Sequence, residues 1–144
     1  MDKINEMRID FSAVEENEAF ARVAAGAFML QLNPMVEEME DVKTAVSEAV
    51  TNAIIHGYRN QGGMICLSAT LYEDRHIEIE IVDCGAGIAD VEQAMEPLYT
   101  SCPEMERSGM GFTVMETFMD SLSVISTVGR GTTVHMSKQL KTPV

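Results

Sequence analysis

The stretch SEAVTNAIIHG, residues 47–57, has a helical pattern that carries a carboxylate and an amide on one stripe. Thr44, Glu48, Asn52 and His56 recur every four residues and therefore stack along one face. Asn is a poor helix former, and its amide oxygen is a suitable ligand for a hard cation. A carboxylate one turn away could accept a proton from an attacking hydroxyl or water. Taken alone, the stripe is equally compatible with a solvated helix edge.

A second motif, DCGAG at residues 83–87, comes directly after a strand pattern. Its Asp83 could accept a hydrogen bond from an exocyclic amine such as that of adenine, and Gly85 and Gly87 would let the backbone approach a purine. The alternative is a plain turn between a strand and a helix, which is the more frequent use of such glycines. The third glycine of a GxGxxG fingerprint is absent, which argues against a dinucleotide site.

A third motif, RSGMGF at residues 107–112, leads into a helix. Gly109 and Gly111 could simply cap that helix, or they could leave backbone N–H groups free to bind a di- or triphosphate. Arg107 and Ser108 directly before them favour phosphate binding. The sequence GxxxxGKS or GxxxxGKT does not occur, which excludes a P-loop. In this order, the three motifs together indicate a site for Mg-nucleotide.

Composition and charge exclude several classes of protein. The 144 residues are 46% hydrophobic and 23% charged, which predicts one globular domain over residues 1–144. A net charge of −13 argues against nucleic acid and against anionic membranes as partners, because both attract concentrated Lys and Arg. Cys66, Cys84 and Cys102 form no C-x-x-C pair, so we expect a reducing cytoplasm rather than disulfides or zinc. No signal peptide is expected, and the longest apolar stretch, residues 19–32, is too short to cross a bilayer.

The first part of the chain predicts a strand and two helices. Alternation over residues 7–11 predicts the strand, and SAVE at residues 12–15 has the pattern of a capping box that opens the first helix. Asn-Pro at residues 33–34 ends this helix. The second helix extends over residues 35–57, with Gly57 in the position just past a helix end. The apolar face predicted for the first helix consists of Phe20, Val23, Ala24, Ala27 and Phe28.

The rest of the chain predicts two hairpins with a loop and a helix between them. The complete order, β-αα-ββ-loop-α-ββ, predicts a two-layer α/β sandwich with the helices on one face of a mixed, mostly antiparallel sheet. The later predicted elements are strands over residues 64–72, 76–82, 122–128 and 132–136, a helix over 111–120, and a long mobile loop over 89–108 with a short helix near 91–95.

These motifs resemble those of a known family. E-x-x-x-N, D-x-G-x-G, G-x-G and then GTT at residues 131–133 are similar to the N box and the three glycine boxes of the GHKL ATPases, which share the Bergerat ATP-binding fold. Within that group, VSEAVTNAIIHGY at residues 46–58 and ERSGMGFTVMETFMD at residues 106–120 closely resemble the anti-sigma F factors of endospore-forming bacteria. The resemblance covers residues 9–140 and implies a Bergerat fold.

The resemblance implies a role for each residue that matches a family motif. Glu48 would be the general base, Asn52 the Mg²⁺ ligand, and Asp83 the acceptor for the adenine amine. Residues 89–108 would form an ATP lid. Arg22 matches a family position that contacts protein partners, although by its sequence alone it is a helix-surface arginine. The residues implied to bind ATP or ADP are Asn52, His56, Asp83, Gly85, Gly87, Ile88, Arg107, Ser108, Gly109, Met110, Gly111 and Thr132.

The resemblance also implies a protein-serine kinase that doubles as an anti-sigma factor. Such a protein would phosphorylate a serine of an anti-anti-sigma protein and, with ATP bound, would sequester a sporulation sigma factor, sigma F, as a homodimer. Two alternatives stay open, a stress-response anti-sigma kinase of the same family and a nucleotide-dependent sigma-binding module without kinase activity. A histidine kinase or a gyrase-type machine is not expected, because 144 residues leave no room for their further domains.

Overall fold

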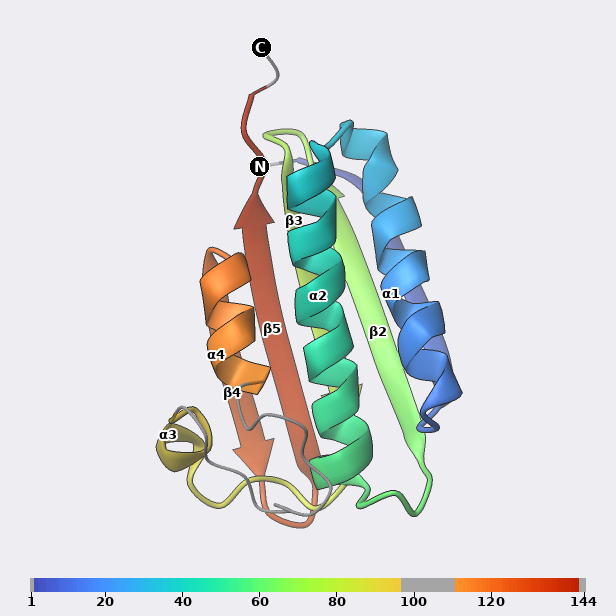
Figure 1. The fold of residues 1–144 in the computed structure, drawn as a ribbon, viewed down its shortest axis with the longest axis vertical. Helices are drawn as coiled ribbons and strands as arrows, with labels where there is room; N and C mark the ends of the chain where they lie inside the picture. Colours follow the sequence, from blue (N-terminus) through green and yellow to red (C-terminus); the bar gives the residue numbers. More distant parts are fainter. Residues whose placement is uncertain (1, 97–110, 143–144) are drawn as a thin grey trace.

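The structure, a computed structural model, describes residues 2–96 and 111–142. The elements are β1 (Lys3–Ser12), α1 (Glu16–Met29), η1 (Leu30–Leu32), α2 (Val36–Asn52), η2 (Ala53–Gly57), β2 (Met64–Tyr72), β3 (His76–Asp83), α3 (Val91–Ala94), α4 (Gly111–Phe118), β4 (Ser121–Thr127) and β5 (Gly131–Gln139). The strands form one sheet in the order β1-β2-β3-β5-β4, and each neighbouring pair is antiparallel. Three helices, α1, α2 and α4, cover one face of it (Figure 1). The predicted two-layer α/β sandwich is therefore confirmed, although the sheet is antiparallel throughout rather than mixed.

Helix α2 is the centre of the helical layer and lies between α1 and α4 (Figure 1). It has 17 residues and buries Val42, Val46 and Val50, which recur every four residues. Its exposed acidic residues, Glu37 and Glu40, lie near its start. In the part of the chain that the structure describes, no helix is long and apolar enough to cross a membrane.

The alternation in β2 and β3 determines which face of the sheet the helices cover. Every second residue from Ile65 to Leu71 in β2, and from Ile77 to Ile81 in β3, is almost completely buried. Their neighbours, such as Glu80, point to the open face and are partly exposed. Each fully buried aliphatic side chain contributes roughly 1.5–3 kcal/mol. This row of branched side chains therefore holds the helices on one side of the sheet.

Helix α1 buries a different face from the predicted one. Phe20 and Val23 are 54% and 61% exposed, whereas Ala21, Ala25 and Met29 are fully buried. The predicted face is therefore wrong, since none of its members is fully buried. Small side chains on the buried face let α1 lie close against α2, and close packing of two helices favours them over the larger apolar residues.

The capping box predicted at residues 12–15 does not form. Ser12 is the last residue of β1, and α1 begins only at Glu16, without a side-chain hydrogen bond to cap it. The Asn17 side chain instead donates to the carbonyl oxygen of Ser12 at 2.9 Å. The prediction fails because Ser12 pairs with the neighbouring strand β2 and so belongs to the sheet.

The second helix ends in a π-helical turn, η2, that extends through Gly57. Arg59 and Asn60 are the left-handed residues at this end, with φ angles of 50° and 61°. The Asn60 N–H closes the helix by donating to the carbonyl oxygen of Ile54 at 3.0 Å. Gly57 therefore lies within the last helical turn and not, as the sequence predicts, past the helix end. A glycine is required at this position for another reason.

Glu38 and Arg75 form a polar clamp where the β2–β3 turn, the α1–α2 connection and the C-terminal segment meet. The Glu38 carboxylate accepts the backbone N–H groups of Met35 and Lys141, both at 2.8 Å. Arg75 donates to the carbonyl oxygens of Leu32, at 2.7 Å, and Lys141. Burial raises the pKa of Glu38, but the two N–H donors and the Arg75 charge outweigh it and hold that pKa below its ordinary value.

Candidate functional site

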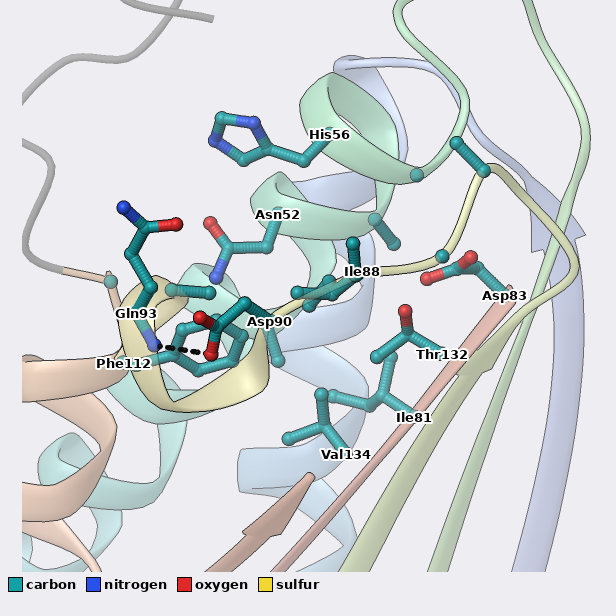
Figure 2. Close-up of a pocket in the computed structure, with 18 of the residues that line it drawn as sticks. Asn52, His56, Ile81, Asp83, Ile88, Asp90, Gln93, Phe112, Thr132 and Val134 are labelled. Carbon is teal, nitrogen blue, oxygen red and sulfur yellow. Dashed lines mark hydrogen bonds between the residues drawn. The ribbon is translucent and has the colours of Figure 1, made fainter. Parts of the chain in front are cut away.

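A cavity of about 390 Å³ opens between the end of α2, η2, the end of β3 and the loop after it, α3, the start of α4, the β4–β5 turn and the start of β5. Asp83 and Thr132 lie on one side of it, and Asn52, Asp90 and Gln93 lie on the other (Figure 2). Its volume is within the range of roughly 300–1,000 Å³ that is typical of small-molecule sites. The cavity is therefore the best candidate for the predicted nucleotide site.

The structure brings many of the predicted site residues onto the wall of this cavity. Glu48 and Gly85 are not among the lining residues. Positions 107–110, and residues 97–108 of the predicted lid, lie outside the described residues. The predicted residues that line the cavity are Asn52, His56, Asp83, Gly87, Ile88, Gly111 and Thr132.

The Asp83 carboxylate is a buried acceptor at the end of β3, where the residue is only 6% exposed. The Gly85 N–H donates to its Oδ1 atom at 2.9 Å, and the backbone N–H of Thr132 also bonds to it. Burial raises the pKa of Asp83, and these two N–H groups oppose that rise. A carboxylate that has lost part of its hydration gains from a further N–H donor, such as an amine of a ligand.

The Asp83 carboxylate explains the glycine at position 57. A Cβ atom on Gly57 would lie 2.9 Å from the Asp83 Oδ1 atom and 3.1 Å from its Oδ2 atom. The carbonyl oxygen of Gly57 also accepts the N–H of Ala86 at 2.7 Å. Only the approach of η2 to the end of β3 creates this requirement, so the local sequence around Gly57 contains no signal for it.

The loop after β3 is held against the β4–β5 hairpin. The Ile88 N–H donates to the Ser126 hydroxyl at 2.7 Å, and the Gly129 N–H donates to the carbonyl oxygen of Ala86 at 2.8 Å. Gly87 has a left-handed φ of 78°, and a Cβ atom on it would lie 2.3 Å from the Thr127 carbonyl oxygen. These contacts fix the path of the backbone that forms one wall of the cavity.

The Tyr58 hydroxyl supports the start of the same loop. It accepts the backbone N–H of Cys84 at 2.7 Å and donates to the carbonyl oxygen of Met64 at 2.5 Å. Burial raises the pKa of Tyr58, so the hydroxyl keeps the proton that it donates. The sequence pattern did not single out Tyr58, because its partners come from two other segments, the start of β2 and the loop after β3.

The cavity also has an apolar floor that the motifs do not include. Ile81 and Val134 lie beneath Asp83 and Thr132 (Figure 2). Each is two residues away along its strand from one of these polar residues, so it shares the same face of the sheet. This period-2 relation was available in the sequence and could have identified both residues. Asp90, Gln93 and Glu96, from the described part of the predicted lid, also line the cavity, as does Arg59, which the sequence did not single out.

The Asn52 amide faces the first residue of α4. A Cβ atom on Gly111 would lie 3.0 Å from the Asn52 Nδ2 atom and 3.1 Å from its Oδ1 atom. The free N–H groups at a helix N-terminus favour anions such as phosphate. Mg²⁺ usually takes only one or two protein oxygens and completes its shell with phosphate and water, so the Asn52 amide oxygen fits this ion. Among residues 2–96 and 111–142, no cluster of His, Cys, Asp or Glu could hold a metal by itself.

Glu48 lies one turn before Asn52 on α2 and is partly buried. Its position on the same stripe as Asn52 agrees with the sequence pattern. Because it does not line the cavity, it is placed beside the space for a small molecule rather than within it.

Comparison with known proteins gives a family match over most of the chain and relatives of high sequence identity. Residues 11–138 match the family described as "Histidine kinase-like ATPase domain". The chain is 57% identical to the anti-sigma F factor of Clostridium acetobutylicum over 135 residues and 60% identical to that of Clostridium beijerinckii over 136 residues, and each match covers 94% of both chains.

Two solved structures share the fold at low sequence identity. The RsbU and RsbW domains of a Mycobacterium tuberculosis protein match with a TM-score of 0.71 and 18% identity, over 98% of this chain and 34% of that one. A histidine kinase domain from Erythrobacter litoralis matches with a TM-score of 0.55 and 21% identity, over 73% of this chain and 46% of that one. The fold, the cavity and the two Clostridium anti-sigma F factors agree. The chain therefore belongs to the anti-sigma F factor family, which has a histidine kinase-like ATPase domain.

Proposed function

We propose that this protein binds Mg-ATP or ADP in the cavity and acts as a protein-serine kinase that is also an anti-sigma factor. The observation that carries the proposal is that Asp83 and Asn52 lie on opposite sides of one cavity (Figure 2). The Asp83 carboxylate would accept the exocyclic amine of adenine, and Ile81 and Val134 would contact the apolar face of the base. The phosphates would then extend toward Asn52 and the start of α4.

The proposed phosphotransfer assigns different tasks to neighbouring residues. The Asn52 amide oxygen would hold Mg²⁺, which offsets negative charge on the phosphates when it is bound. Glu48 would take the proton from the serine hydroxyl of a docked protein as that oxygen attacks the γ-phosphate and the bond to the leaving ADP breaks. A place beside the cavity rather than within it suits a base whose substrate arrives on another protein.

We further propose that the sequestered partner is a sigma F-like sporulation sigma factor and that the phosphorylated substrate is an anti-anti-sigma protein. The names of the relatives support the first proposal. Arg22 is exposed on α1, and Phe20 and Val23 of the same helix are both more than half exposed. A helix that exposes a cation and large apolar side chains offers groups that are common in protein interfaces. We place the protein, as a homodimer, in the cytoplasm, and its net charge of −13 disfavours nucleic acid and membranes as partners.

Incubation with γ-labelled ATP and a purified anti-anti-sigma protein tests the kinase. We expect label on a serine of the partner, and we expect candidate sigma factors to co-purify with the protein in ATP but not in ADP. Nucleotide-dependent capture of a sigma factor without any labelled serine would contradict the kinase assignment and would favour a sequestration module.

Replacement of Gly57 with Ala is expected to weaken ADP binding by about 10- to 100-fold. The added Cβ would press on the Asp83 carboxylate, and a misplaced charge-assisted hydrogen bond costs roughly 1.5–3 kcal/mol. Titration calorimetry with ADP measures the effect. Gly26→Ala in α1 is the matched control, because the atoms nearest to its Cβ would belong to the flexible Lys43 side chain, the first of them at 2.9 Å. Equal affinities for the Gly57→Ala variant and the wild type would contradict this role of Gly57.

A further inference from the structure

Ser126 continues a polar row that crosses the end of the sheet. In the strand register, Asp83 of β3 pairs with Thr132 of β5, and Thr132 pairs with Ser126 of β4. Ser126 shares its face of β4 with Leu122 and Val124, which are both partly buried and pack against the core. A hydroxyl in a series of otherwise apolar inward positions needs hydrogen-bonding partners.

The Ser126 hydroxyl has three such partners. It accepts the N–H of Ile88 at 2.7 Å, and it lies 3.1 Å from the carbonyl oxygen of Gly131 and 2.8 Å from the Oγ1 atom of Thr132. Ile88, from the loop, and Thr132, from β5, both line the cavity, whereas Ser126 itself does not. Ser126 can therefore act on a ligand only through these two neighbours.

The hydrogen-bonding capacity of these groups determines where the protons lie. A hydroxyl donates one hydrogen bond, and a carbonyl oxygen can only accept. If Ser126 donates to the Gly131 carbonyl oxygen, the Thr132 hydroxyl donates to Ser126 and every group in the set has a partner. If Ser126 donated to Thr132 instead, the Gly131 carbonyl oxygen would lose its bond to Ser126. The first arrangement gives more groups a hydrogen-bonding partner. It leaves the Thr132 Oγ1 atom able only to accept a hydrogen bond from a ligand in the cavity.

We propose that Ser126 is a positioning residue that fixes the Thr132 hydroxyl as an acceptor and thereby makes the site select 6-amino purines over 6-oxo purines. This inference rests on the proposed adenine nucleotide site. The Thr132 hydroxyl lies beside the Asp83 carboxylate (Figure 2). An ionised carboxylate is also an acceptor only, so the ligand meets two acceptors. Such a pair matches an amine with two N–H bonds and repels a carbonyl oxygen in the same place.

The affinities for ADP and for IDP, the inosine analogue with a 6-oxo group, test the proposal by calorimetry. The wild type should prefer ADP. In the Ser126→Ala variant the Thr132 hydroxyl can turn and donate to a 6-oxo group, so we expect the ratio of the IDP and ADP dissociation constants to fall about tenfold. The Ser126→Thr variant keeps the hydroxyl and should have the wild-type ratio of the two dissociation constants. Ser123→Ala, at an exposed site of the same strand, is the control and should leave the ratio unchanged.

A purely structural role of Ser126 would weaken ADP and IDP equally, and an unchanged ratio in Ser126→Ala would therefore overturn the proposal. Thr132→Val provides a second measurement, because it removes the oriented hydroxyl itself. It should lower the same ratio, and Ser126→Ala should add nothing to that effect. If Ser126→Ala does not fold, Ser126→Cys, with its weaker acceptor, takes its place with the same expected direction. A wild type that binds neither nucleotide contradicts the proposed function itself, whereas a preference for ADP of the same size in Ser126→Ala as in the wild type contradicts only the role of Ser126.

Discussion

Replacement of Glu48 with Gln is expected to slow phosphotransfer to a partner serine by roughly 10²- to 10⁴-fold, which is the usual contribution of a general base. Gln has nearly the same shape as Glu but cannot take the proton of the serine hydroxyl. Nucleotide affinity should stay close to that of the wild type, because Glu48 does not line the cavity. Single-turnover labelling of the partner measures the rate, and titration with ADP measures the affinity.

Glu37→Gln is the matched control for this experiment, since Glu37 is an exposed glutamate of the same helix. It changes the net charge by the same amount and should leave both the rate and the affinity unchanged. Normal phosphotransfer by Glu48→Gln would show that another group is the base. A large loss of ADP affinity in Glu48→Gln would show that Glu48 contributes to the nucleotide site itself.

Replacement of Glu38 with Ala is expected to lower the free energy of unfolding by about 3 kcal/mol, because two charge-assisted hydrogen bonds of roughly 1.5 kcal/mol each are lost. The backbone N–H groups of Met35 and Lys141 would lose their acceptor, and Arg75 would lose the charge beside it. Urea unfolding followed by circular dichroism measures the change. Glu37→Ala, at the exposed neighbouring position, should differ from the wild type by less than about 0.5 kcal/mol.

The contribution of Glu38 to the free energy of unfolding is also expected to depend on pH. Its pKa is lower in the folded protein than the ordinary value of 4.5, so the folded state binds the proton less readily than the unfolded state. The stabilisation is therefore present above about pH 4.5 and is lost as the pH falls through the folded pKa. The difference between wild type and Glu38→Ala should be largest near neutral pH and should shrink in acid. A difference independent of pH would assign the effect to packing rather than to the carboxylate.

The strands could be predicted from the sequence because their pattern depends on the sheet alone. Ile77, Ile79 and Ile81 alternate with polar residues, and a strand with one buried face produces this period whatever lies above it. The order of the elements then restricted the architecture to a two-layer sandwich. The same pattern places Asp83 and Thr132 at strand ends, where the structure brings them to one cavity wall.

The predictions from sequence were wrong for residues whose environment depends on contacts with distant parts of the chain. On α1 the exposed Phe20 and Val23 have a stronger apolar pattern than the buried Ala21 and Ala25, but only small residues let α2 come close. Gly57 has the residue type expected past a helix end, yet its φ angle is not left-handed and its glycine is required by Asp83. No pattern within η2 could indicate that contact.

The sequence by itself determined the elements, their order and the motif residues Asn52, Asp83 and Thr132, because periodicity and turn chemistry are local properties of the chain. Only the tertiary structure showed which helix face is buried, why residue 57 is a glycine, and that Ser126 bonds to both Thr132 and Ile88. These features depend on atoms brought within about 3 Å of each other from segments far apart in the chain. Their geometry follows from packing, which no single segment encodes.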